Sequence, residues 1–523
     1  MKIKNNKLLM MAGVLLAGFI YYYIALPAIN IHSAACWIFV LFVGIFIIAS
    51  LSISKNAINK KAIKTGTTII AIYVGVFIIG SILSSPIINA SKFQKLLEVK
   101  EKNFTEDIKQ ISYEKVPILD KDSARQIGER KMGTMLDMVS QFEVGDMYTQ
   151  INFKGVPSRV TPLEYANTIK WMTNRKNGIP GYIKIDMATQ NAEVVKLDKG
   201  MKYSTNEHFG RNIYRYLRFK YPTYIFDSVN FEIDDNGTPY WICPVKKYNI
   251  GLFGGVTIGK VVLVNAVTGQ IQEYSIEQVP SWVDRVYSAE MLIALYDYHG
   301  SLSHGYLNSV LGQKDSLETT DGYNYIALED DVWVYTGITS VSGDQSNVGF
   351  VLMNQRTMET RYYIIPGATE YSAMNSAEGQ VQHLNYNATF PLLLNIAGEP
   401  TYFIALKDGA GLVKKYAMVN VEKYQIVAIG DSVMDCEKAY IKLMKENGKT
   451  NVNSSTLKKQ SGKIEKIVQA VVEGNSHFYI ILEGSEEIFD ITLAEMPQVV
   501  AYEIGQEVIF EYIEGENYNT VIK

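Results

Sequence analysis

The sequence predicts an α+β protein in three parts: three N-terminal transmembrane helices, tandem modules that each combine a helix with an antiparallel sheet, and a small C-terminal β-barrel. The first part is predicted by three uncharged apolar runs of about 20 residues each, in a stretch where no acidic residue precedes Glu98. A helix of that length crosses the ~30 Å hydrocarbon layer of a bilayer. The other two parts are predicted by strand-like runs and turn signals that recur after Pro86.

The membrane anchor is expected to occupy residues 1–90, with helices at 8–29, 34–53 and 66–85. Lysines precede the first run and fill the second loop, whereas the short loop Asn30–Ser33 has none. The positive-inside rule then places the N-terminus in the cytoplasm and the large C-terminal part outside the cell membrane. Lys92 and Lys95, after the third run, argue the other way, but long domains translocate largely regardless of such charges. A cleaved signal peptide is the alternative for the first run, and the cluster Tyr21–Tyr23 argues against it.

Composition narrows the class of protein further. The net charge is −4, which gives no general nucleic-acid footprint. Only three cysteines occur, and Cys243 and Cys436 match no metal or redox spacing. A surface protein without a disulfide framework, rich in Lys, Ile and Asn, fits the envelope of a Gram-positive bacterium.

The region after a juxtamembrane linker or helix at 91–121 repeats one pattern of elements. Asn or Asp turns stand between strand-like runs at Asp186, Asn265, Asn354 and Asn420, because these side chains cap nearby backbone amides. Amphipathic stretches separate the runs and predict helices at Asp122–Gln141, Asn206–Lys220, Ser281–Tyr298, Glu370–Gln380 and Asp431–Glu446. The turns and helices recur about every 80–100 residues, and such a repeat predicts tandem modules. Their expected bounds are 122–200, 201–280, 281–366 and 367–447, with a linker at 448–459.

These modules resemble the PepSY domain, in which a helix is followed by strands that end in an Asn/Asp-x-x-Thr-Gly turn. The segment Val262–Ile271 carries the pattern best, and Thr268 is the one threonine of the four turns with a glycine after it. The resemblance implies a membrane-anchored envelope protein of Gram-positive bacteria that binds or restrains other proteins. It carries no catalytic residues onto this chain.

The tail at 460–523 predicts about five short strands punctuated by glycines, an arrangement similar to an OB-fold barrel. OB-folds often bind single-stranded nucleic acid. From Thr456 onward, however, five lysines face twelve acidic residues, a net charge of −7 that repels phosphates. A structural or protein-docking barrel is the better interpretation.

Local motifs offer few candidates for chemistry. Gly254-x-x-x-x-Gly259-Lys260 lacks the Ser or Thr of a phosphate-binding loop and is followed by a strand-like run. His299 and His304, with Asp297 nearby, match no metal-ligand spacing. We therefore expect no catalytic residue, no cofactor and no metal.

One helix carries a candidate anion-binding stripe. Arg211, Arg215 and Arg218 lie four and three residues apart beside an apolar face. Guanidinium groups bind phosphate and carboxylate well, and a solvated helix face is the alternative interpretation.

Together these patterns favour a noncatalytic scaffold or regulatory binding protein of the cell envelope, integral to the membrane, whose partners are other envelope or membrane proteins and not nucleic acid. The alternatives are an envelope hydrolase or transferase with a site assembled between modules, and a subunit of a multi-protein surface machine. The oligomeric state does not follow from the sequence.

Overall fold

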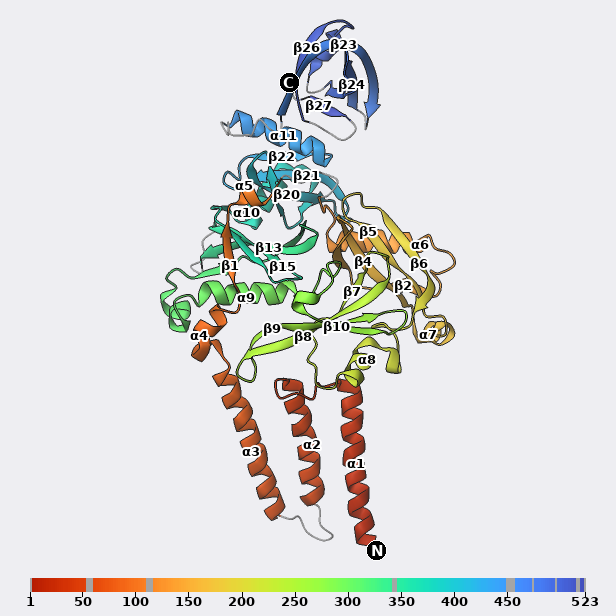
Figure 1. Ribbon diagram of the computed structural model, residues 1–523, viewed down its shortest axis with the longest axis vertical. Helices are drawn as coiled ribbons and strands as arrows, with labels where there is room; N and C mark the ends of the chain where they lie inside the picture. Colours follow the sequence, from red (N-terminus) through yellow and green to blue (C-terminus); the bar gives the residue numbers. More distant parts are fainter. Residues whose placement is uncertain are drawn as a thin grey trace. The chain divides into compact units, whose positions relative to one another are not determined.

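A computed structural model describes residues 2–52, 60–109, 116–340, 346–447, 457–472, 475–493, 496–513 and 518–521. It is a mixed α+β structure with several antiparallel sheets (Figure 1). The chain forms two compact units. Unit 1 comprises Met1–Lys102 and Ser112–Thr369, and unit 2 comprises Asn103–Ile111 and Glu370–Lys523.

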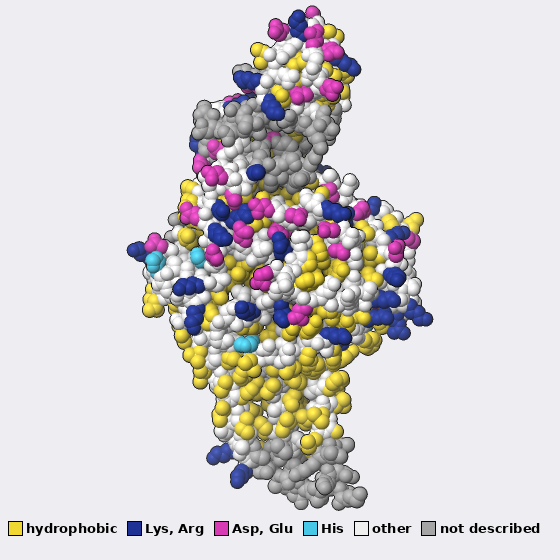
Figure 2. All heavy atoms as spheres, viewed as in Figure 1, with side chains coloured by type: hydrophobic (Ala, Val, Ile, Leu, Met, Phe, Trp, Pro, Cys, Tyr) yellow, Lys and Arg dark blue, Asp and Glu magenta, His cyan; other side chains and the backbone are white. Residues whose placement is uncertain are grey.

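Three helices open unit 1: α1 (Lys2–Ala25), α2 (Ala34–Ser52) and α3 (Lys60–Leu83). Within the described residues, Ile63–Leu83 is long and apolar enough to cross a membrane, whereas the apolar stretches Met10–Ala25 and Ala34–Ser50 are shorter. Hydrophobic side chains cover these helices (Figure 2).

The predicted bounds of the first and third N-terminal helices need correction. The first helix ends at Ala25 and not at residue 29, because Pro27 lacks the N–H that would continue the ladder. The third begins at Lys60, six residues earlier than predicted, and ends at Leu83, shortly before Pro86 starts the next helix.

The predicted juxtamembrane linker contains regular structure. It forms α4 (Pro86–Gln94), β1 (Val99–Lys102) and α5 (Phe104–Asp107). Strand β1 pairs in parallel with β16 (Thr360–Tyr363), so this segment belongs to a sheet formed much later in the chain. A pairing partner that distant leaves no local sequence signal.

The first sheet of unit 1 follows α6 (Lys121–Gly133). Its strands pair in the order β2-β4-β5-β6, with β3 on β4, and α7 (Thr168–Asn174) lies between β4 and β5 in sequence. The strands are β2 (Phe142–Val144), β3 (Thr149–Phe153), β4 (Val156–Tyr165), β5 (Ile179–Asp186) and β6 (Ala192–Met201). The predicted helix 122–141 is therefore too long by eight residues at its C-terminal end.

The second sheet follows the 3₁₀ turn η2 (Phe209–Arg211) and α8 (Ile213–Lys220), which is shorter than the predicted helix 206–220. It is a simple antiparallel meander in the order β10-β9-β8-β7. Its strands are β7 (Asn230–Ile233), β8 (Pro239–Ile250), β9 (Gly254–Asn265) and β10 (Ile271–Ser275), and η3 (Ile276–Gln278) follows them.

The third sheet has the order β1-β16-β15-β13-β11, with β12 on β13. Helix α9 (Ala289–Ser301) precedes it and is capped by Ser288, whose Oγ accepts the N–H of Met291 at 3.3 Å. The predicted helix 281–298 thus begins eight residues too early. The remaining elements are η4 (Asn308–Gly312), β11 (Leu317–Thr319), β12 (Asn324–Leu328), β13 (Asp331–Ser340), β15 (Gly349–Asn354) and the two-stranded pair β14 (Ser346–Asn347) with β17 (Gly367–Ala368).

The middle sheet of unit 1 is buried on both faces. Trp241, Cys243 and Val262 belong to a core shared with the first sheet. Their neighbours Ile242 and Val261 belong to a second core, shared with α9 and the third sheet. Alternate residues of a strand point to opposite faces, so the continuous apolar run along β9 serves two cores at once.

Unit 2 contains a fourth sheet and a barrel. The sheet has the order β18-β20-β21-β22, with β19 on β20, and α11 packs on β21 and β22. Its elements are α10 (Glu370–Gln380), η5 (Gln382–Leu384), β18 (Asn387–Ala388), β19 (Leu392–Ile396), β20 (Glu399–Lys407), β21 (Val413–Asn420), β22 (Val427–Gly430) and α11 (Val433–Glu446).

Five further strands close into a barrel in the order β23-β24-β25-β27-β26 (Figure 1). They have a core of their own, which includes Ile480, Phe489 and Phe510. Strand β23 starts at Leu457, inside the predicted linker, whose residues 448–456 lie outside the described part of the chain. The elements are β23 (Leu457–Val472), β24 (Asn475–Leu482), β25 (Ile488–Thr492), η6 (Pro497–Ala501), β26 (Glu507–Ile513) and β27 (Asn519–Val521).

The four predicted Asn/Asp turns each lie in a different sheet. They join β5 to β6, β9 to β10, β15 to β16 and β21 to β22, the last two strands of each antiparallel meander. The side-chain oxygen of Asn265, for example, accepts the N–H groups of Val267 and Thr268 at 3.0 and 2.9 Å. Equivalent contacts are made by Asp186, Asn354 and Asn420.

Candidate functional site

Arg218, one of the three predicted anion-binding arginines, is occupied by backbone carbonyls. Its Nε donates to the carbonyl of Leu26, just past the end of α1, at 2.9 Å. Another guanidinium nitrogen donates to the carbonyls of Tyr224, Tyr221 and Pro222 at 2.7, 3.2 and 3.3 Å. Burial lowers the pKa of Arg218. This side chain therefore joins α8 to the end of the first apolar helix.

Arg215 lies on the same side of α8. Its guanidinium carbon stands 4.3 Å from the centre of the Tyr23 ring, and a terminal nitrogen donates to the carbonyl of Phe209 at 3.0 Å. Phe219 adds ring contacts to Tyr22 and Tyr23. Two arginines of the stripe thus face α1, where stacking on tyrosine supports docking.

Arg211 points elsewhere and lines a basic pocket. It belongs to η2, and its guanidinium donates to the carbonyl of Arg175 at 2.8 Å. The cavity beside it has a volume of about 700 Å³. It is lined by Lys176, Asn177, Gly178, Pro180, Leu197, Asp198, Lys199, Gly200, Lys202, Tyr203, Arg211, Val267 and Thr268. Four basic residues and one acidic residue are therefore part of its lining.

The structure thus separates the three predicted arginines instead of forming one anion site from them. The pocket lysines come from the α7–β5 loop and the end of β6, so no single stretch of sequence indicates the site. Two of its lining residues had been singled out in the sequence: Arg211 in the predicted stripe and Thr268 in the turn that begins at Asn265.

A second cavity of about 530 Å³ lies beside the end of α3. Its lining includes Ser85, Phe253 and Met291, together with Asp227 and Lys246, which form an ion pair of 3.0 Å. This cavity mixes apolar and paired charged groups, so it favours no particular ligand class.

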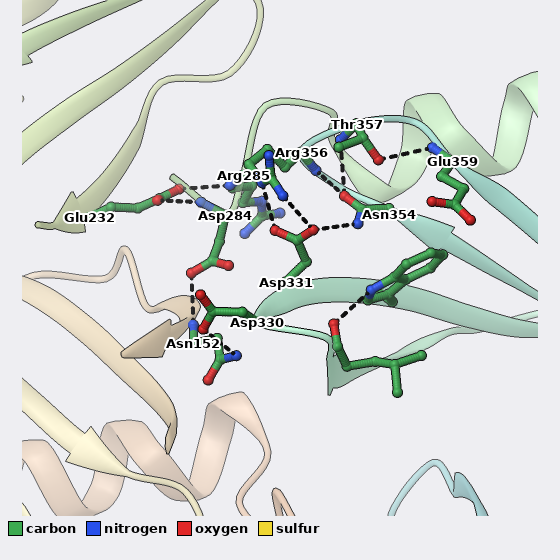
Figure 3. Close-up of polar contacts among 12 residues, drawn as sticks. Asn152, Glu232, Asp284, Arg285, Asp330, Asp331, Asn354, Arg356, Thr357 and Glu359 are labelled. Atoms are coloured by element: carbon green, nitrogen blue, oxygen red, sulfur yellow. Dashed lines mark hydrogen bonds and ion pairs between the residues drawn. The ribbon is translucent and has the colours of Figure 1, made fainter. Parts of the chain in front are cut away.

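Acidic side chains also converge inside unit 1, where its three sheets meet (Figure 3). Glu232 of β7 is fully buried and accepts the N–H groups of Asp284 and Arg285 at 2.9 and 3.0 Å. Asp284 in turn accepts the N–H of Asn152, in β3, at 2.7 Å. Each carboxylate therefore joins backbone from two different sheets or their connections.

The neighbouring Asp331 completes this acidic cluster. Both of its oxygens bind Arg356, at 2.6 and 2.8 Å, and Asn354 donates to it at 2.7 Å (Figure 3). This geometry is a bidentate ion pair supported by the third Asn turn. Asp331 begins strand β13, and none of the sequence motifs indicated Glu232, Asp284 or Asp331 as members of one cluster.

Burial changes the acidity of the cluster. It raises the pKa of Glu232 to about 7, although two backbone N–H groups and Arg285 oppose the shift. Burial, followed by the charge of Glu232, raises the pKa of Asp284 well above its usual value. Neither of the two cavities described above is lined by these acids. Their contacts give the acidic cluster a role in joining the sheets.

The sequence motifs for metal and nucleotide binding have ordinary structural settings. His299 lies in α9 and its Nδ1 is 3.3 Å from the carbonyl oxygen of Gln94, whereas the Nε2 of His304 is 3.5 Å from an oxygen of Asp315. Among the described residues, no group of three or more His, Cys, Asp or Glu side chains could hold a metal ion. Gly254 through Lys260 lie within strand β9.

Comparisons with known proteins give no family. No family model matches the chain, and no curated protein matches it. Among solved structures, a GH32 beta-fructofuranosidase from Bombyx mori aligns over 77% of this chain and 70% of its own, at 8% identity and a TM-score of 0.17. The polysaccharide lyase Uly1 aligns over 72% and 75%, at 8% identity and a TM-score of 0.16. Similarity at this level carries no functional argument.

Proposed function

We propose that this protein is a noncatalytic scaffold or regulatory binding protein of the cell envelope, held in the membrane by α1, α2 and α3, with its large C-terminal part outside the cell. The observation that carries the proposal is the way the sheets and connections of unit 1 are fixed to the ends of these helices. A body seated directly on its anchor suits a protein that presents surfaces at the membrane.

Polar contacts fix the end of α1 and the loop that follows it. The N–H of Ile29 donates to the carbonyl of Pro222 at 2.7 Å, and Asn30 donates to the carbonyl of Thr223 at 3.0 Å. His32 stacks on Tyr248 and its Nδ1 lies 2.7 Å from the carbonyl oxygen of Leu252. These contacts add to the bond between Arg218 and Leu26.

The end of α3 is fixed in the same way. The Oγ of Ser84 accepts the N–H groups of Leu252 and Phe253, in the β8–β9 turn, at 2.8 and 3.2 Å. The ring of Phe253 packs against Trp37 and Phe77. A polar side chain beside an apolar helix needs hydrogen-bond partners, and here the backbone of the β8–β9 turn supplies them for Ser84.

The orientation rests on charge at the opposite end of the helices. Lysines 60, 61 and 64 lie in the first turns of α3, at the opposite end of that helix from Ser84. By the positive-inside rule that end is cytoplasmic, so the part of unit 1 that follows α3 would be extracytoplasmic. The test is protease added to intact, wall-stripped cells. Digestion of the chain after Lys92 is expected, and full protection would overturn the orientation.

We also propose that the four meanders with their Asn/Asp turns are PepSY-like modules and that the barrel is OB-like. The shared place of the turn, between the last two strands, supports the first assignment. Five strands closed in the order first-second-third-fifth-fourth support the second. Neither assignment brings a catalytic residue, which agrees with a binding role.

The partner is proposed to be another envelope or membrane protein, with no cofactor involved. Crosslinking in living cells, followed by purification of the tagged full chain from membranes, tests this. A specific protein recovered with the native chain, and lost on deletion of residues 457–523 or of a sheet, would support the proposal. Recovery of the same proteins with an unrelated three-helix anchor would contradict it.

A further inference from the structure

We propose that the basic pocket beside Arg211 binds the phosphate headgroup of an anionic phospholipid. The proposal rests on the membrane anchoring argued above and adds a ligand class to it. Four observations carry it: the cavity itself, its excess of positive charge, the preformed geometry of its walls, and its connection to the end of α1.

The charge of the pocket is largely uncompensated. Lys176, Lys199, Lys202 and Arg211 line it together with one acid, Asp198. Among the described residues, none of these four bases forms an ion pair with a carboxylate. Ammonium and guanidinium groups bind phosphate oxygens through charge-assisted hydrogen bonds.

The walls of the pocket are held by contacts that do not involve its ligand-facing amines. The ends of β5 and β6 approach so closely that a side chain at Gly178 (φ +83°) would meet the carbonyl of Met201. Arg175 places its guanidinium 5.3 Å from the Trp171 ring centre, and its carbonyl accepts Arg211. The site is therefore built before any ligand arrives, which lowers the cost of binding.

A buried carboxylate ties α7 to the segment that carries Arg211. Glu207 accepts Trp171 Nε1 and the hydroxyl of Tyr165, both at 2.8 Å, and is 2% exposed. Because Glu207 lies two residues before η2, this contact fixes the distance between the α7 and η2 sides of the pocket.

The pocket adjoins the membrane-facing part of unit 1. Arg211 directly precedes α8, whose Arg215 and Arg218 contact α1. Apolar side chains near it stand exposed, with Phe209 at 63% and Ile169 and Met172 of α7 at 66% and 54%. Basic side chains gather over the α7 region in Figure 2. Exposed apolar groups among bases fit a lipid headgroup better than a soluble anion.

The test uses the full-length protein in a neutral detergent. Phosphatidylglycerol or phosphatidylcholine is added in mixed micelles, and bound lipid is counted by native mass spectrometry while the thermal unfolding midpoint is followed. A ligand that binds the folded state raises that midpoint. Inorganic phosphate at matched ionic strength forms a third arm.

The pocket variant is K176Q/K199Q/K202Q, and the control is K109Q/K121Q/K314Q, which removes the same charge from exposed lysines elsewhere. Each base near a membrane surface contributes about 1 kcal/mol, so the pocket variant should lose about 100-fold in phosphatidylglycerol affinity. The control should bind as the native chain does. K176E alone provides a second, milder variant if the triple variant unfolds at a lower temperature without lipid.

The proposal would be overturned if the pocket variant bound phosphatidylglycerol as well as the native chain does. It would also be overturned if the native chain bound phosphatidylcholine as well as phosphatidylglycerol. Inorganic phosphate that matches the effect of phosphatidylglycerol would show a site for a soluble anion, which also overturns it. A wrong membrane orientation would appear only in the protease experiment, because anionic lipid can be offered from either side in micelles.

Discussion

At the scale of residues, the three arginines of the 211–218 segment are held by backbone carbonyls and not by acids. Arg218 alone serves Leu26, Tyr221, Pro222 and Tyr224. A guanidinium can satisfy several carbonyls in fixed directions, which an ammonium cannot. The stripe that the sequence suggested as a ligand site is therefore used largely for docking a helix.

This arrangement predicts that Arg218→Lys destabilises the protein although the charge is kept. Loss of charge-assisted hydrogen bonds to the end of α1 should cost about 1.5–3 kcal/mol. Thermal or urea unfolding of the detergent-solubilised chain measures it. Lys220→Gln, on the exposed side of the same helix, is the control and should change stability by less than about 0.5 kcal/mol. Equal effects of the two substitutions would contradict the docking role.

The buried acids predict a dependence of stability on pH. Raised pKa values mean that the folded state binds more protons than the unfolded state, so these groups lower stability as pH rises from about 4.5 through the folded pKa near 7 of Glu232. Asp284→Asn removes one of them and can still accept the N–H of Asn152. The variant should gain about 1–3 kcal/mol relative to the native chain between about pH 5 and pH 8.

Unfolding curves at the two pH values check this expectation. Asp235→Asn, in the exposed β7–β8 turn, is the matched control and should show no such gain. If Asp284→Asn and the native chain keep the same stability difference at both pH values, the carboxyl of Asp284 does not carry the proposed penalty.

At the scale of elements, turns were predicted from the sequence far better than helix ends. An Asn or Asp side chain caps its own turn locally, so the four turns needed no tertiary information. The helix predicted from Ser281 exists but begins at Ala289, because the apolar Val283 and Val286 are buried in an irregular segment before it. Strand β1 was not predicted, because the strand with which it pairs lies over 250 residues later in the sequence.

The same limit applies to the candidate site. Arg211 was visible as part of a helical stripe, whereas Lys176, Lys199 and Lys202 come together only when β5, β6 and the α7–β5 loop have folded. Glu232 could have been noticed, because a carboxylate inside the apolar strand Asn230–Ile233 needs a buried partner. The groups that bind it, the backbone N–H groups of Asp284 and Arg285, could not be predicted from the sequence.

Replacing the turn asparagine by aspartate should have different effects on stability in two of the turns. Asn265→Asp should be nearly neutral, because Asp186 already forms the equivalent turn in the first sheet. Asn354→Asp should cost about 2–4 kcal/mol, because Asn354 donates to Asp331 and a carboxylate there would repel it. Urea unfolding of both variants tests this. A cost for Asn265→Asp as large as for Asn354→Asp would show that the turn itself, not the acidic cluster, sets the energy.

At the scale of the whole molecule, the chain divides into two compact units, the first with three of the large sheets and the second with the fourth sheet and the barrel. The first three sheets share cores, since the middle one is covered on both faces. A sheet with two buried faces cannot be separated from its neighbours without exposing apolar surface, and a periodic sequence does not reveal which faces are shared.

The barrel differs, because its core cluster is drawn entirely from its own segment, Ile464 through Val521. We therefore predict that residues 456–523 fold when produced alone, although a domain of this size buries only about 60% of its unfolded surface and should be marginally stable. Dispersed amide signals in a nuclear magnetic resonance spectrum and a cooperative thermal transition are the expected results.

The net negative charge of the same fragment predicts that it does not bind nucleic acid. With five lysines and twelve acids it should not bind a labelled single-stranded oligonucleotide at physiological salt. Salt-sensitive oligonucleotide binding by the folded fragment would reveal a local basic groove and remove protein docking as its role. A fragment that stays unfolded alone but folds when residues 370–447 are included would show that the barrel depends on the preceding sheet. In that case, deleting the barrel from the full chain should lower the stability of the remaining chain instead of releasing a partner protein.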